Sequence, residues 1–103
     1  MKDKAQKLIE KYEELESELG NPDVLADQAR YNKIHKQYKG IEKAVQKAKE
    51  YLQLVNDLAE YKAALGDPDP EMVAMAKSEI SDIEKKLPEV TDELQILMVP
   101  KDP

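Results

Sequence analysis

Two apolar stripes separated by a proline-rich turn constrain the fold of this chain more than any other feature. The first stripe has apolar residues at alternating steps of three and four: Tyr31, Ile34, Tyr38, Ile41, Val45, Ala48, Leu52 and Val55. The second stripe repeats that spacing: Val73, Ala76, Ile80, Ile83, Leu87, Val90, Leu94 and Leu97. Residues spaced in this way share one face of a helix, and two such faces bury each other as an antiparallel coiled-coil pair. The sequence therefore predicts a long antiparallel helical hairpin.

The turn between the stripes carries three local signals that agree. Gly66 suits the end of the first long helix, because glycine tolerates the left-handed conformation of many helix caps. Asp69 and Pro70 suit the N-cap and the first position of the next helix. We therefore predict helices over residues 28–65 and 70–98.

Gly40 and Pro88 test the continuity of these two helices. Gly40 should cost about 1 kcal/mol relative to alanine, but the apolar stripe stays in phase across it. Pro88 removes one backbone hydrogen bond and favours a kink. We expect each helix to continue through its breaker.

A third, shorter helix is predicted over residues 2–19, followed by a short connection. Its apolar face consists of Ala5, Leu8, Tyr12, Leu15 and Leu19. Gly20 and Pro22 stop it, since glycine tolerates a left-handed cap and proline cannot extend the helix.

Pairing the long arms about their turn gives a specific register. It places Ile41 near Leu94 and Tyr38 near Leu97, so that Tyr31 and Ile34 project as a ledge that the N-terminal helix can cover. The predicted fold is all-α: a coiled-coil-like hairpin with the shorter helix packed on it, as a three-helix bundle over residues 1–98. Residues 99–103 are expected to begin a linker.

Composition bounds the class of protein. The 103 residues allow one domain, and 37% charged residues with tyrosine as the only aromatic type are typical of long solvated helices. A net charge of −6 argues against a general nucleic-acid binder. No apolar run is long enough to span a bilayer, and the start lacks a signal-peptide core, so a cytoplasmic protein is expected.

Residues that could support catalysis are sparse. The single histidine, His35, has no cysteine or second histidine to form a metal site with it. The three glycines are far apart, which excludes a phosphate-binding loop. Core packing is the expected role of Met72, Met75 and Met98. We therefore expect no enzyme activity, no cofactor and no small-molecule substrate.

Two charged surfaces are candidate partner sites. The first is a basic stripe, Arg30, Lys33 and Lys36, at the start of the first long helix. Two interpretations of this stripe stay open: it faces phosphates of a partner such as RNA, or it matches the acidic end of the N-terminal helix. The second is an acidic tip: Asp67, Asp69 and Glu71.

Two segments carry a family resemblance. Residues 66–72, with Met75, Ala76 and Glu79 after them, and the exit at residues 97–103 resemble the N-terminal helical domain of the bacterial peptide chain release factor 1 family. Residues 12–15, 21–24 and Asp27 add weaker support, and Pro88 has no place in the family pattern.

The resemblance implies a role in translation termination. Factors of this family read a stop codon in the ribosomal A site and trigger hydrolysis of peptidyl-tRNA. Their codon-reading Pro-Xaa-Thr and catalytic Gly-Gly-Gln tripeptides lie in later domains, and neither occurs here. The N-terminal domain reaches towards the stalk base of the large subunit and affects interplay with the release-factor GTPase. No catalytic residue is carried over.

Two hypotheses follow. The leading one is a ribosome-contacting accessory domain of a release factor, not catalytic in isolation. The alternative is a free-standing coiled-coil scaffold or adaptor that dimerises through the ledge at Tyr31 and Ile34. A domain with so small a core should be marginally stable alone, so that a neighbouring domain or self-association would help it.

Overall fold

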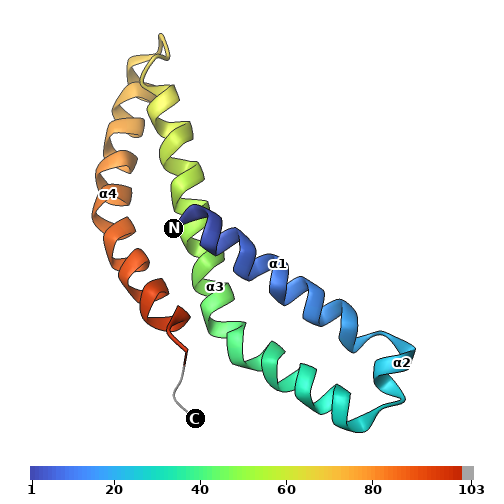
Figure 1. Ribbon diagram of the computed structural model, residues 1–103. Helices are drawn as coiled ribbons and strands as arrows, with labels where there is room; N and C mark the ends of the chain where they lie inside the picture. The colour runs from blue at the N-terminus through green and yellow to red at the C-terminus, as the bar shows by residue number, and fades with distance from the viewer. Residues whose placement is uncertain (101–103) are drawn as a thin grey trace.

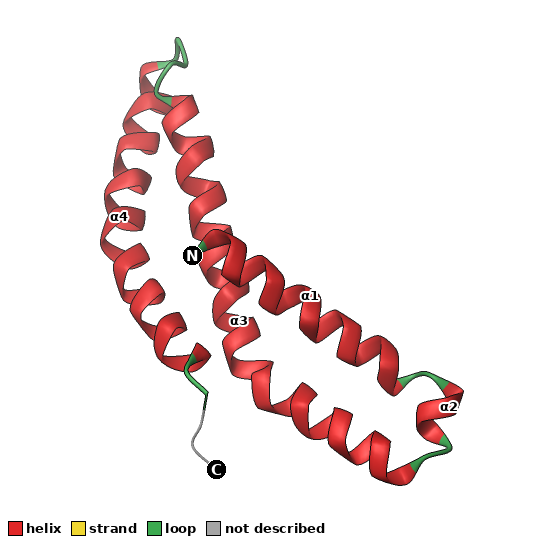
Figure 2. Cartoon of the chain, in the orientation of Figure 1, coloured by secondary structure: helices red, strands yellow, loops and turns green. Residues whose placement is uncertain are grey.

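The chain folds into helices only, in the computed structural model, which describes residues 1–100. The helices are α1 (Lys2–Leu19), α2 (Pro22–Leu25), α3 (Gln28–Ala64) and α4 (Pro70–Met98) (Figures 1 and 2). The molecule measures 61 × 30 × 16 Å, and its radius of gyration is 18.7 Å. A compact domain of this length would have a radius of gyration of about 13 Å. The all-α prediction is confirmed, and the long helices make the molecule elongated.

Helix α3 is the centre of the fold. Helix α4 packs antiparallel along its C-terminal half, and α1 packs along its N-terminal half (Figure 1). Within residues 1–100, the backbones of α1 and α4 do not approach each other closely. The bundle therefore consists of two antiparallel hairpins that share one long helix.

The two hairpins meet at an apolar junction near the middle of α3. One buried residue from each long helix forms its centre: Ala5, Ala48 and Leu94. Two of the three are alanines, so there is little side chain to hold the helices apart. Small residues at a helix contact allow close approach, and the leucine of α4 then fills the space that remains.

A second apolar cluster lies at the opposite end from the tip. Leu15, Val24 and Ile34 are buried there, and Leu19 and Tyr31 pack against them. Helix α1 thus covers the predicted ledge, as expected. Because Ile34 is only 7% exposed, the ledge no longer offers its main apolar surface for dimerisation.

The short helix α2 was not predicted, although its start signal is present in the sequence. Asn21 is its N-cap, with Oδ1 accepting a hydrogen bond from the backbone N–H of Asp23 at 2.9 Å, and Pro22 follows at the first position. Its Val24 is fully buried in the second cluster. The sequence alone predicts only a short connection here, so α2 is a correction to that prediction.

The predicted register is wrong near the end of α4. Leu94 packs with Ala48 in the junction, whereas Ile41 packs with the second cluster around Leu15. Tyr38 stacks on Tyr12, with ring centroids 4.3 Å apart, and is not paired with Leu97. The physical reason is that α3 follows α1 in its N-terminal half and diverges there from α4 (Figure 1).

The long helices begin as predicted. Asp69 caps α4, with its Oδ1 accepting from the backbone N–H of Glu71 at 3.0 Å, and Asp27 caps α3 by accepting from Arg30 N–H at 3.1 Å. Neither Gly20 nor Gly66 has a positive φ, so the expected left-handed caps are wrong. Both helices end instead in right-handed turns.

Gly40 and Pro88 both lie inside uninterrupted helices. Pro88 has no N–H to donate to the carbonyl group four residues earlier. Because Pro88 is exposed, that carbonyl group lies within reach of water. Figure 1 shows α4 as a bowed rod without a break.

Replacing Gly40 with alanine is expected to stabilise the chain by about 1 kcal/mol. The new Cβ would meet no atom within 4 Å, and the backbone at this position is already helical. Thermal unfolding followed by circular dichroism should show a midpoint higher by roughly 4–8 °C. Gly66→Ala is the control, because Gly66 lies outside the helices and should gain much less. A lower midpoint for Gly40→Ala would show that α3 is not a regular helix there.

Candidate partner-binding surfaces

The described residues offer no candidate centre for metal or acid–base chemistry. No three histidine, cysteine or acidic residues among them lie close enough to hold a metal ion. His35 is exposed, and its ring stacks near Tyr31 at a centroid distance of 6.0 Å. Within residues 1–100, no charged or polar residue is buried. The candidate sites predicted from the sequence are two charged surfaces that a partner could contact.

The acidic tip joins α3 to α4, and its three predicted residues are all exposed. Two of them stabilise the turn. Asp67 Oδ1 accepts a hydrogen bond from Asp69 N–H at 2.8 Å, and Asp69 in turn caps α4. Glu71 lies in the first turn of α4, where a negative charge interacts favourably with the helix dipole. The carboxylates at the tip therefore serve the local fold while remaining open to a partner.

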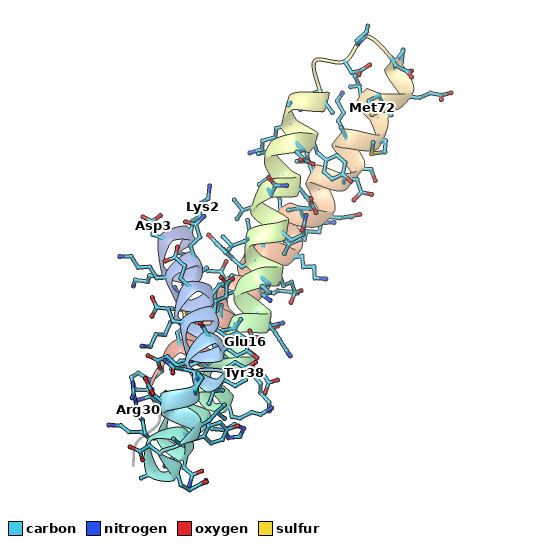
Figure 3. All side chains as sticks on the ribbon, turned by 90° about the vertical axis from the view of Figure 1, so that its right-hand side faces the viewer. Lys2, Asp3, Glu16, Arg30, Tyr38 and Met72 are labelled. Atoms are coloured by element: carbon cyan, nitrogen blue, oxygen red, sulfur yellow. The ribbon has the colours of Figure 1, made fainter. Side chains whose placement is uncertain are left out.

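Exposed apolar side chains accompany these acids, which the sequence did not reveal. Leu65, Met72 and Met75 are exposed at the tip end, where Figure 3 labels Met72. The prediction that Met72 and Met75 pack in the core is wrong. They occupy positions in α4 that lie off the buried stripe of Val73 and Ala76. Methionine is common at adaptable binding surfaces, because its side chain is flexible and polarizable.

The basic stripe lies at the opposite end of the molecule. Figure 3 labels Arg30 near one end and Met72 near the other, so the structure keeps the two predicted surfaces apart. Arg30, Lys33 and Lys36 are all exposed. Within residues 1–100, no ion pair joins them to the acids of α1. The stripe therefore makes no close ion pair with α1 in the described part of the chain.

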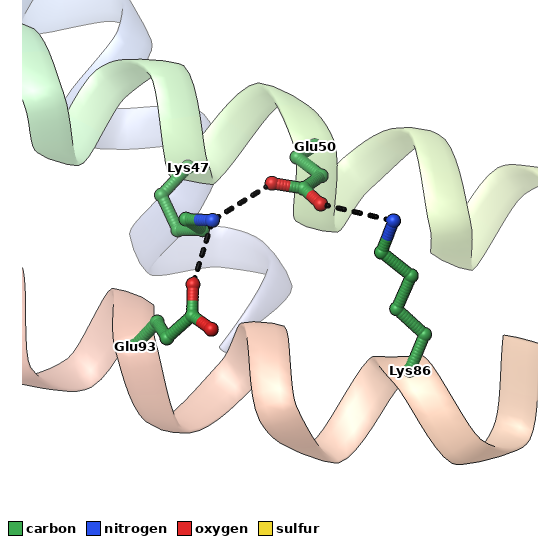
Figure 4. A network of polar contacts seen from close by, with 4 residues as sticks. All are labelled: Lys47, Glu50, Lys86 and Glu93. Atoms are coloured by element: carbon green, nitrogen blue, oxygen red, sulfur yellow. Dashed lines mark hydrogen bonds and ion pairs between the residues drawn. The ribbon is translucent and has the colours of Figure 1, made fainter.

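A charge network that sequence reasoning missed joins α3 to α4 between the junction and the tip (Figure 4). Lys47 Nζ lies 2.7 Å from Glu93 and 2.9 Å from Glu50, and Lys86 Nζ lies 3.6 Å from Glu50. The hydrogen bonds that Lys47 donates to Glu93 and Glu50 raise the pKa of Lys47, and the bond that Glu50 accepts from Lys47 lowers the pKa of Glu50. The network links α3 to α4. It contains no residue of the acidic tip or of the basic stripe.

No helix among residues 1–100 combines the length and the apolar character that crossing a membrane requires.

No solved structure matches the chain significantly. Sequence comparisons are informative. Peptide chain release factor 1 of Oleidesulfovibrio alaskensis is 44% identical over 100 residues, which are 97% of this chain and 28% of the relative. The same factor of Acidobacterium capsulatum is 35% identical over 103 residues, which are 100% of this chain and 29% of the relative.

The chain thus spans less than a third of the length of these curated relatives. The PCRF domain model matches residues 8–103, which include the last two thirds of α1 and the whole of α2, α3 and α4. The resemblance to peptide chain release factor 1 is confirmed. On the strength of this match, the chain belongs to the PCRF domain family.

Proposed function

We propose that this chain is an accessory domain of a class I peptide chain release factor, which contacts the ribosome and supports stop-codon-dependent translation termination. The family match over residues 8–103 is the observation that carries the proposal. The domain has no hydrolytic activity of its own. This part of the proposal follows from the resemblance, in which the Gly-Gly-Gln tripeptide belongs to later domains of the factor.

The proposed partner is the large ribosomal subunit, at its stalk base, and the release-factor GTPase is a second partner. Both follow from the resemblance to the release factor 1 family, and a cytoplasmic location is part of the same proposal. The elongated shape supports the proposal, because a hairpin in a molecule 61 Å long can carry a contact surface far from the domains that follow it.

The tip is the contact surface that we favour. It combines the acids Asp67, Asp69 and Glu71 with exposed apolar side chains, among them Met72 and Met75 at the start of α4. Binding hot spots need apolar side chains that a partner can desolvate, together with polar neighbours that fix orientation. The basic stripe of Arg30, Lys33 and Lys36 is the second candidate. It would face ribosomal RNA, because its charges suit phosphates.

The 103-residue chain is expected to co-sediment with purified large subunits and to release no peptide from peptidyl-tRNA. Lys33→Glu/Lys36→Glu separates the two surfaces. At low salt the variant should bind as well as the unchanged chain if the tip makes the contact, and much more weakly if the stripe faces RNA phosphates.

Absence of binding where the full-length factor still binds would contradict the accessory-domain proposal. A tight dimer in sedimentation velocity, without ribosome affinity, would favour the scaffold alternative.

A further inference from the structure

The last turn of α4 is mostly apolar, with Gln95 as its one polar residue. Leu94 and Met98 face the junction, whereas Ile96, Leu97 and Val99 form an exposed apolar patch. Ile96 is 73% exposed and Val99 is 66% exposed. Large apolar side chains that gather on one face of a helix are normally covered by a neighbouring element. The outer face of this turn therefore lacks a cover within residues 1–100.

A groove of about 690 Å³ adjoins the patch, between α1, the middle of α3 and the end of α4. Leu8 and Leu15 line it from α1, Ile41 lines it from α3, and Leu97 and Val99 line it from the patch. Lys11, Lys36 and Gln37 also line the groove, so patch and groove form one continuous surface that is mainly apolar with a polar margin. Contiguous exposed apolar surfaces usually mark interaction sites, whereas isolated apolar residues do not.

We propose that this surface is the docking site for the polypeptide that follows residue 103 in the full-length protein. The inference rests on the proposed function, which makes this chain one domain of a longer factor. More than two thirds of each matched relative lies outside the match. The backbone at Val99 is extended, with φ −69° and ψ 127°, and Val99 and Pro100 both line the groove. The chain therefore leaves α4 at the groove itself.

Interface size favours this occupant over a second copy of the chain. A stable interface between separate molecules buries about 800 Å² on each partner. Three partly exposed side chains and one groove offer less than that. A tethered segment is present at an effective concentration in the millimolar range, so a small interface suffices to hold it.

Thiol reactivity tests the proposal in the full-length protein. The 103-residue chain contains no cysteine, so cysteines elsewhere in the protein are replaced by serine and one thiol is introduced with Ile96→Cys. Ser81→Cys is the matched control, because Ser81 is exposed on the same helix, away from the patch. We expect the thiol at position 96 to react with a maleimide roughly tenfold more slowly than the thiol at 81, which corresponds to about 90% docking. In the 103-residue chain alone, the two rates should be similar.

Equal rates at positions 96 and 81 in the full-length protein would overturn the proposal. The proposal would also be overturned if the thiol at position 96 reacted slowly in the 103-residue chain and faster on dilution. A second copy of the chain would then be the occupant. Val99→Cys provides a second thiol in the patch and must show the same protection. This measurement does not involve ribosomes. A failure of the proposed ribosome-binding function is therefore distinguishable from a failure of the docking proposal, which would appear as a loss of thiol protection.

Discussion

Leu94→Ala is expected to lower the free energy of unfolding by about 3 kcal/mol, the largest effect of any single truncation in this chain. Leu94 is fully buried where the three long helices meet, and its partners Ala5 and Ala48 are too small to fill the cavity left behind. Small domains are stabilised by only about 5–15 kcal/mol in total. Urea unfolding followed by circular dichroism should therefore show a large drop in the midpoint concentration.

Leu97→Ala is the control, because it removes the same atoms three residues further along the same helix. Leu97 is 40% exposed, and its truncation should cost less than about 1 kcal/mol. Equal losses in the two variants would mean that the junction is not packed as the structure describes.

The second large effect is expected at the tip. Met72→Ser/Met75→Ser should weaken binding to the large subunit at least tenfold, because hot-spot side chains contribute about 2 kcal/mol or more and 1.4 kcal/mol corresponds to a factor of ten. Both side chains are exposed, so the thermal midpoint should change little. Binding is measured with fluorescently labelled chain titrated with purified large subunits.

Leu25→Ser provides the matched comparison at the other end of the molecule. Leu25 lies on α2, is exposed, and loses a similar amount of apolar surface. Unchanged affinity is expected. If instead Leu25→Ser weakens binding and the tip variant does not, the partner contacts the end that carries the basic stripe.

The sequence predicts the long helices well because their signals are local. The bounds of α1 and α4 match the prediction, and α3 ends one residue earlier. Apolar spacing, Asp27 and Asp69 as N-caps, and Pro70 at the first helical position act within a few residues of one another. Signals of this range can be read without knowing what the helix packs against.

The register at the junction could not be predicted in the same way. Ala5 and Ala48 are weakly hydrophobic and common on exposed helix faces, so the pattern does not mark them as the point where three helices meet. The predicted pairing counted residues back from the turn and assumed that α3 and α4 stay together. Competition from α1 for the N-terminal half of α3 is a long-range effect, which spacing along one helix does not report.

The features of the candidate surfaces also divide into those that the sequence predicts and those that it does not. The acids at the tip were found because an acidic turn is visible in the sequence, whereas the exposure of Met72 and Met75 depends on which face of α4 meets α3. The contact between Lys47 and Glu93 joins residues far apart in the chain, and no local pattern predicts it.

The sharing of α3 between two hairpins has a mechanical consequence. Within residues 1–100, the hairpin near Met72 is joined to the hairpin near Val24 by the backbone of α3 and by the apolar side chains that pack around Ala5 and Leu94. We expect bending of the molecule to concentrate at this junction, because each hairpin is held along its own length by an apolar seam. A small reorientation there would displace the tip without breaking either seam.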